Sequence, residues 1–296
     1  MVGARGRPRE VSVVIGTRGS ALALAQARIV ADLLAEPTEL RTIRTAGDSS
    51  AAPLSELGDG VFVAAIERAL AAGEIDVAVH SLKDLPTAER DGLMIAAILE
   101  REDPRDVLVT RERGGLPSLP PRAVVGTSSP RRAAFLRALA PGVTTREIRG
   151  NVDTRLRKVS EGAYDATVLA LAGLRRVGIP VSDVEILSLA QCPPAPGQGA
   201  LAVQCRRSDE SLAARLARLD HGPTRRAVAA ERALLRDLGA SCALALGAHA
   251  RAESDELVLD AALVSDGRVM RATVRGRDAD ELAARAAASL REPARA

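Results

Sequence analysis

Short apolar runs alternate with helical patterns through the first two thirds of the chain. Four of these runs have the length of strands: residues 11–15, 76–80, 123–126 and 166–171. Two segments have the apolar spacing of helices: residues 21–34 and 130–139. This alternation predicts α/β layers with mostly parallel strands. A strand that leads into a polar turn and a helix occurs near residue 17 and again near residue 127, which predicts two lobes of similar architecture.

Two further stretches, residues 100–105 and 191–199, are expected to be chain crossings between the lobes, since the second is rich in Pro and Gly. Two crossings imply a hinge. From residue 223 onward the pattern changes to a helix, an antiparallel hairpin that turns at Asp266 and Gly267, and a last helix. Helices that are segregated from an antiparallel sheet predict a separate small α+β domain.

The predicted fold class is therefore α/β, with two lobes that have mixed, largely parallel sheets and a small C-terminal α+β domain. We expect residues 1–101 together with 198–220 to form the first lobe, residues 102–197 the second lobe, and residues 221–296 the third domain.

Composition narrows the class of partner. The 296 residues are 47% hydrophobic, which is enough to fill several cores, but aromatic residues are 1% and Trp is absent. A platform on which nucleic-acid bases stack is therefore not expected. A net charge of +3 fits local anion binding by arginine better than a surface for nucleic acid.

The remaining composition points to a cytoplasmic protein without a metal site. No apolar stretch approaches the roughly 20 residues of a membrane span, and the arginine-rich first ten residues lack the apolar core of a secretion signal. Three widely spaced cysteines suit neither a disulfide framework nor a zinc site. The three histidines are too scattered for a metal-ligand pattern.

Lysine usage singles out one position. Of 41 Lys and Arg residues, only Lys83 and Lys158 are lysines, and Lys83 lies beside Asp84 at the end of an apolar run. An ammonium group can shift its pKa, whereas a guanidinium group stays charged. Lys83 and Asp84 are thus the first candidates for chemistry, with a chance surface lysine as the alternative.

A second candidate is the start of the helix near residue 130. Ser129 is a suitable N-cap and is followed by proline, which places Arg131 and Arg132 in the first helical turn. Cations there oppose the helix dipole by about 0.3–1 kcal/mol each. An anion held by the free N–H groups, the hydroxyls of Thr127 and Ser129 and the two guanidinium groups would offset this. The alternative is that both side chains turn into solvent.

Further arginines lie in similar turns. Arg18 precedes a helix for which Ser20 is the expected cap, Arg149 lies in a Gly/Asn turn, and Arg155 lies on the helix that follows it. Such turns would line one cleft between the lobes. Because guanidinium groups bind carboxylates and phosphates through two hydrogen bonds, the ligand should carry several anionic groups.

The cysteines differ in their surroundings. Cys242 lies in a short loop of small residues, where a bulky electrophile could reach the thiol, although a buried structural role is the alternative. Cys205 lies in a strand pattern and is expected to be a packing residue. Cys192 has no evident role in the sequence.

These segments together resemble the porphobilinogen deaminase family, also called hydroxymethylbilane synthases, over nearly the whole chain. The matching blocks are residues 15–27, 79–86, 100–106, 126–132, 148–155, 165–178 and 196–206 and the loop around Cys242. The resemblance implies a cytoplasmic monomer with two lobes like those of periplasmic binding proteins. It also implies a third domain with a dipyrromethane cofactor, covalently attached through Cys242.

The family's function follows from the same resemblance. Such an enzyme condenses four porphobilinogen units head to tail on the dipyrromethane primer, releases ammonia at each step, and finally releases hydroxymethylbilane for tetrapyrrole synthesis. Asp84 matches the catalytic aspartate. The positions that match cofactor-binding residues are Cys242, Lys83, Asp84, Thr127, Ser129, Arg131 and Arg132. The positions that match substrate-binding residues are Arg18, Ser20, Arg149 and Arg155.

One departure and one alternative accompany this interpretation. Residues 54–62 match a mobile lid that contains lysines in many relatives, but here the loop carries Glu56 and Asp59. The alternative function is a two-lobed anion-binding or sensor module without catalysis. That module would explain the arginine turns and the hinge, but not a Lys-Asp pair together with a lone cysteine in an added domain.

Overall fold

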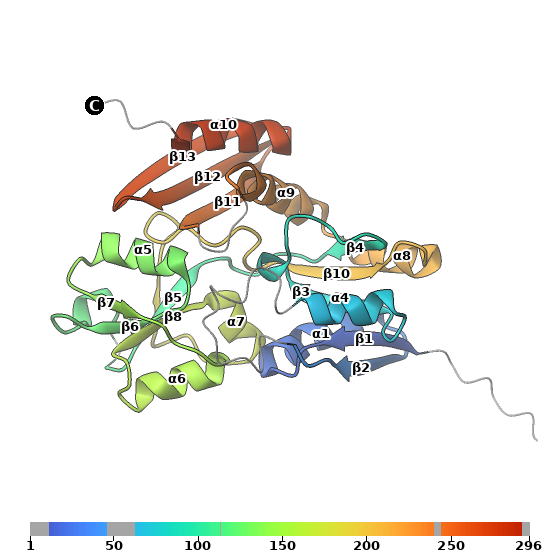
Figure 1. Ribbon diagram of the computed structural model, residues 1–296, viewed down its shortest axis with the longest axis horizontal. Coiled ribbons are helices and arrows are strands. Elements are labelled where there is room, and N and C mark those ends of the chain that lie inside the picture. The colour runs from blue at the N-terminus through green and yellow to red at the C-terminus, as the bar shows by residue number, and fades with distance from the viewer. Residues whose placement is uncertain (1–11, 46–62, 113, 240–243, 292–296) are drawn as a thin grey trace, which may run out of the picture.

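The two predicted lobes lie side by side, and the third domain packs across one end of both (Figure 1). The computed structural model describes residues 12–45, 63–112, 114–239 and 244–291. The loop at residues 54–62 and Cys242, both singled out in the sequence, lie outside these ranges.

The first lobe is built on a five-stranded sheet in the order β2-β1-β3-β10-β4. Its strands are β1 (Val13–Thr17), β2 (Thr38–Thr42), β3 (Val77–Ser81), β4 (Leu93–Ile98) and β10 (Leu201–Arg206). Its helical segments are α1 (Ala21–Leu34), α4 (Ala64–Ala71), the 3-10 turn η1 (Leu82–Asp84), α8 (Glu210–Leu216) and η3 (Ala217–Leu219). β1 is parallel to β2 and β3, whereas β10 is antiparallel to both of its neighbours.

The second lobe has a sheet of the same design, in the order β7-β6-β8-β5-β9. Its strands are β5 (Asp106–Thr110), β6 (Val124–Gly126), β7 (Thr144–Arg146), β8 (Ala166–Ala170) and β9 (Glu185–Ile186). Its helical segments are η2 (Leu116–Ser118), α5 (Pro130–Leu139), α6 (Val152–Ser160) and α7 (Leu171–Arg176). The antiparallel strand is β5, which directly follows the first crossing, just as β10 directly follows the second. Each crossing thus delivers the chain into the interior of a sheet.

The third domain is a three-stranded antiparallel sheet covered by two helices. Its elements are α9 (Gly222–Asp237), β11 (Leu246–Glu253), β12 (Glu256–Ser265), β13 (Arg268–Gly276) and α10 (Ala279–Arg291). Alanines and leucines from both helices fill one core with the inner face of the sheet.

The predicted architecture is confirmed: two lobes with largely parallel sheets, and a small α+β domain. The predicted N-caps are also confirmed, because the Ser20 hydroxyl accepts a hydrogen bond from Ala23 N and the Ser129 hydroxyl accepts one from Arg132 N. The strands β2, β4, β5, β7, β9 and β11 were not predicted.

Both crossings are fastened to α9 by one buried carboxylate. Glu231 is fully buried and receives two hydrogen bonds from Arg101, at 2.6 Å and 3.1 Å. The same carboxylate accepts the backbone N–H groups of Gly197 and Ala250, each at 2.7 Å. Arg101 belongs to the first crossing and Gly197 to the second, so Glu231 joins both to the third domain.

The tight approach of the two crossings predicts a cost for any side chain at Gly199. This residue has φ +90°, and a Cβ there would collide with the carbonyl oxygen of Glu102. Gly73 has φ +75° but open space around it. Replacing Gly73 with Ala should cost about 1–3 kcal/mol of unfolding free energy through backbone strain alone.

Gly199→Ala should cost about 1–3 kcal/mol more than Gly73→Ala, because the crossings must also move apart. Urea unfolding of both variants measures the difference. Equal losses in the two variants would show that the crossings are not tightly packed.

Candidate active site

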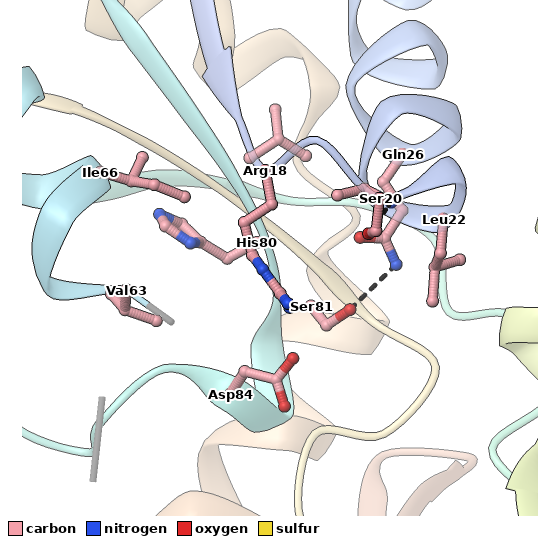
Figure 2. A pocket seen from close by; sticks show the side chains of 11 residues that line it. Arg18, Ser20, Leu22, Gln26, Val63, Ile66, His80, Ser81 and Asp84 are labelled. Atoms are coloured by element: carbon pink, nitrogen blue, oxygen red, sulfur yellow. Dashed lines mark hydrogen bonds between the residues drawn. The ribbon is translucent and has the colours of Figure 1, made fainter. Parts of the chain in front are cut away.

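A cavity opens at the carboxyl ends of β1 and β3, between the starts of α1 and α4 (Figure 2). It is lined by Arg18, Ser20, Leu22, Ala23, Gln26, Val63, Ile66, Val79, His80, Ser81 and Asp84. The parallel pairing of β1 with β3 places the turn after β1, which carries Arg18 and Ser20, beside the η1 turn after β3, which carries Asp84. Three predicted site residues therefore meet in one cavity.

Asp84 is exposed and points into this cavity (Figure 2). Leu82 in η1 and Leu85 just after it point the other way, since both are buried in an apolar cluster. Among the described residues, no side chain donates a hydrogen bond to the Asp84 carboxylate. The carboxylate is thus available to a ligand that brings its own N–H groups.

The wall of the cavity beside α4 carries a neutral histidine. Burial lowers the pKa of His80 to about 4, against a smaller raising effect of the neighbouring Gln204 side chain. His80 is therefore uncharged at neutral pH, and the cationic group of the cavity is Arg18.

A second group of charges lies at the start of α5. Asp106, the first residue of β5, is fully buried, and its two carboxylate oxygens accept hydrogen bonds from Arg131 and Arg132, each at 2.7 Å. Burial raises the pKa of Asp106, but the two guanidinium charges lower it more, so the carboxyl group stays ionised. The alternative that both arginines turn into solvent is wrong, since each is less than 10% exposed.

Asp106 is the functional residue that the sequence reasoning missed. The sequence predicts an anion at the start of α5 that offsets the two cations. The protein supplies this anion itself, from a strand residue 25 positions before Arg131. One feature of the sequence could have identified Asp106: it directly follows the first crossing and ends a block that resembles the family.

The Asp106 cluster consists of Asp106, Arg131 and Arg132. Gln198 links it to Lys83 of the first lobe. The side-chain amide of Gln198 donates to Asp106 Oδ1 at 2.9 Å and accepts from Lys83 Nζ at 3.2 Å. Burial and the charge of Arg132 together lower the pKa of Lys83 to about 8, against the opposing effect of Asp84. Cations from both lobes are thus held around one buried carboxylate.

The cluster retains unused donors. The Nε–H groups of Arg131 and Arg132 are both buried and have no hydrogen-bond partner among the described residues. Buried donors without acceptors are costly, so an anionic ligand that accepted from these two groups would be favoured. A cofactor with several carboxylates fits the charge and the hydrogen-bonding capacity of the cluster.

The remaining predicted residues of the second lobe lie around this cluster. Thr127 is buried and accepts a hydrogen bond from Ser129 N at 3.2 Å. Burial and the charge of Arg132 lower the pKa of Arg155 to about 10. Arg155 is therefore close enough to the cluster to interact with its charges. Arg149 is half-buried, and its Nε donates to Glu147 at 3.0 Å.

Two of the three thiols are packed in the interior. Cys205 lies in the core of the first lobe, as predicted for a packing residue. Cys192 is buried beside Asp106 and Arg131, and burial raises its pKa to about 11. A thiol with such a pKa is almost entirely protonated at neutral pH and is a poor nucleophile.

Within the described ranges, no three His, Cys, Asp or Glu side chains come together in a way that could hold a metal ion. In the same part of the chain, no helix has the length and apolar character needed to cross a membrane.

Comparison with known proteins identifies both parts of the chain. Residues 13–237 match the family model described as porphobilinogen deaminase, dipyromethane cofactor binding domain, and residues 225–292 match the model of the porphobilinogen deaminase C-terminal domain. The porphobilinogen deaminases of Mycolicibacterium paratuberculosis and Mycobacterium tuberculosis are each 54% identical over 239 residues. These matches cover 80% of this chain and 76% and 77% of the relatives.

Solved structures give more distant likenesses. An ancestral cationic amino acid solute binding protein is 14% identical, with a TM-score of 0.42, over 70% of this chain and 87% of its own. The substrate binding protein of an amino acid ABC transporter is 15% identical, with a TM-score of 0.36, over 77% and 95%. Such TM-scores are too low to define a shared fold. The non-catalytic alternative is not supported, because the family matches are to an enzyme.

The Asp106 cluster predicts a large effect of a small change. Asp106→Asn removes the charge that compensates Arg131 and Arg132 and leaves two buried cations unpaired. The free energy of unfolding should fall by about 3–5 kcal/mol. Urea denaturation measures this loss.

A matched control is Glu161→Gln, which removes an exposed pair with Arg157. It should cost about 0.5 kcal/mol or less. If Asp106→Asn were as mild as this control, Asp106 would not be the counter-charge of the cluster.

Proposed function

Because the chain belongs to the porphobilinogen deaminase family, we propose that porphobilinogen loses its ammonia in the cavity lined by Arg18, Ser20 and Asp84. The chain is a transferase of tetrapyrrole biosynthesis and has a dipyrromethane cofactor binding domain. Which residues perform each step is the part proposed here. The observation that carries the proposal is an exposed carboxylate in a cavity that also contains an arginine and a helix N-terminus.

Arg18 and Ser20 provide the end of the cavity that binds the acetate and propionate groups of the substrate. Ser20 already caps α1, so a carboxylate there also meets the positive end of the helix dipole. A guanidinium group suits such a carboxylate through paired hydrogen bonds. Arg149 and Arg155 would bind the acidic groups of the growing chain from the second lobe.

Asp84 performs the charge-stabilising step. Its carboxylate accepts the N–H of the substrate's pyrrole ring. As the C–N bond within the protonated aminomethyl group breaks, the ring nitrogen supplies electrons to the methylene carbon and becomes positively charged. A carboxylate beside that nitrogen stabilises the cation at the point where charge develops. Ammonia leaves, and the same carboxylate can later help to remove the proton that the new C–C bond displaces.

The Asp106 cluster is the proposed holder of the cofactor. Lys83, Arg131 and Arg132 would bind its carboxylates, with Thr127 and Ser129 beside them. When bound, the cofactor would supply a primer with a free pyrrole carbon, to which the first unit is joined, and each later unit would be joined to the one before it. We assign its attachment to Cys242, and support comes from the other two thiols, which are both buried in cores.

The state and location of the enzyme are part of the same proposal. The family resemblance supports a monomer that works in the cytoplasm on a small molecule and without nucleic acid. The acidic residues Glu56 and Asp59 belong to the loop that matches a lid, and its role is a hypothesis from the sequence alone.

The role of Asp84 predicts a loss of turnover without a loss of fold. Asp84→Asn keeps the size of the side chain but removes the charge that stabilises the cation. Release of ammonia from porphobilinogen should fall by about 100-fold or more, whereas the thermal unfolding temperature should stay close to that of wild type. A variant that kept more than about a tenth of the rate would contradict the assignment.

The pKa of Lys83 predicts a pH limit on cofactor loading. The ammonium is charged below pH 8 and loses its proton as the pH rises through about 8. It then stops attracting carboxylates. The rate at which cofactor-free protein acquires its cofactor from porphobilinogen should therefore fall above pH 8.

Lys83→Arg is the control, because a guanidinium group remains charged in this range. Loading of this variant should stay level from pH 7 to about pH 9, as followed by intact mass against time. A parallel fall in wild type and variant would show that Lys83 does not set the limit.

A further inference from the structure

The position of Asp84 is set by its backbone. Its carboxylate receives no hydrogen bond from any described side chain, so within the described part of the chain its place depends on the backbone of the η1 turn. That turn has three residues and closes through one hydrogen bond, from Leu85 N to Leu82 O at 3.1 Å. A 3-10 turn of this length is weak by itself. Something outside η1 must therefore hold it.

The third domain provides that support through Arg232 on α9. One terminal nitrogen of its guanidinium group donates to the carbonyl oxygens of Leu85, at 3.0 Å, and Leu82, at 3.5 Å. The other donates to Pro86 O at 2.6 Å. These carbonyls lie on both sides of Asp84 in the chain. Val228, one turn earlier on α9, packs against the side chains of Leu82 and Leu85 in the same apolar cluster.

Arg232 is committed to these carbonyl groups. It is half-buried, and burial lowers its pKa, with only a partial opposing effect from Glu89. Its nearest acceptors are backbone oxygens, which are fixed in direction, so the planar fork of the side chain transmits the position of α9 to η1.

α9 is itself firmly placed. Glu231, the residue before Arg232, joins this helix to both chain crossings and to β11. The same helix ends at Asp237, five residues before Cys242 in the sequence. One helix therefore leads to the proposed attachment residue of the primer and also holds the turn that carries the proposed catalytic carboxylate.

We propose that Arg232 is a positioning residue for Asp84. By holding the backbone of η1, Arg232 keeps the Asp84 carboxylate at the position in the cavity that the reaction requires. The proposal depends on the role of Asp84 given above. Arg232 acts through the backbone of η1 and does not touch the substrate. Displacement of a catalytic group by about 1 Å can cost about 100-fold in rate, so loss of this support should appear in kcat.

The test compares Arg232→Ala with Arg236→Ala, one turn later on the same helix. Arg236 is exposed and pairs with Asp237 and Asp280 at the surface, without contact to η1. Rates are expressed per cofactor-loaded molecule, with loading determined by intact mass. Arg232→Ala should lower kcat by about 10- to 100-fold and change KM by less than about threefold, whereas Arg236→Ala should leave both near wild type.

Two additional measurements separate positioning from a general structural role. Millimolar guanidinium chloride should restore part of the kcat of Arg232→Ala by occupying the vacated site, and the same concentration of sodium chloride should not. Arg232→Lys, which keeps the charge but cannot span the Leu85 and Pro86 carbonyls as a fork, should have an intermediate kcat.

The proposal is overturned if Arg232→Ala has a kcat per loaded molecule within about twofold of wild type. It is also overturned if the activities of Arg232→Ala and Arg232→Lys fall only in proportion to their loading. Asp84→Asn in the same assay keeps the two proposals apart. An active Asp84→Asn removes the role of Asp84 itself, whereas an inactive Asp84→Asn with a fully active Arg232→Ala removes only the role of Arg232.

Discussion

The buried carboxylate of Asp106 is the constraint on which the cleft depends. Two guanidinium groups at the start of a helix oppose its dipole and could not remain dry without a counter-charge. Asp106 supplies it and, through Gln198, also fixes the ammonium of Lys83 from the other lobe. One negative charge among three cations leaves the cluster attractive to anions, and two unused Nε–H groups give it directional donors. The protein thus forms, before any ligand arrives, a cationic cluster that suits the proposed cofactor with its several carboxylates.

A second buried carboxylate governs how the parts of the chain are joined. Each crossing feeds the antiparallel strand of a lobe, and Glu231 of the third domain accepts hydrogen bonds from both crossings. Arg232 then links the same helix to the turn of Asp84. Through Glu231 and Arg232, two adjacent residues of α9, the small third domain contacts both crossings and a segment that forms the cavity of the first lobe. The domain that is proposed to carry the primer also contacts the turn that holds the proposed catalytic carboxylate.

Local patterns allowed much of the fold and part of the site to be predicted. Ser129 followed by proline marks the start of α5, and the sequence therefore placed Arg131 and Arg132 in its first turn correctly. β11 was not predicted because alanines and a glycine occupy most of its apolar positions, so apolar and polar positions along the strand differ little in hydrophobicity. The buried contacts of Asp106, Gln198 and Glu231 were not predicted, for a different reason. Each is a polar residue whose partner is distant in sequence, and their burial follows from how the lobes and the third domain meet, which local periodicity does not encode.

The proposed mechanism requires that this cleft extends a primer fixed to Cys242. The most direct test is the intact mass of the natively produced protein, compared with Cys242→Ala and with Cys192→Ala as the matched control. We expect wild type and Cys192→Ala to be heavier than their sequence masses by one linked pair of pyrroles, and Cys242→Ala not to be. An unmodified wild-type mass, even after incubation with porphobilinogen, would contradict the proposed mechanism, and so would an adduct that persists in Cys242→Ala.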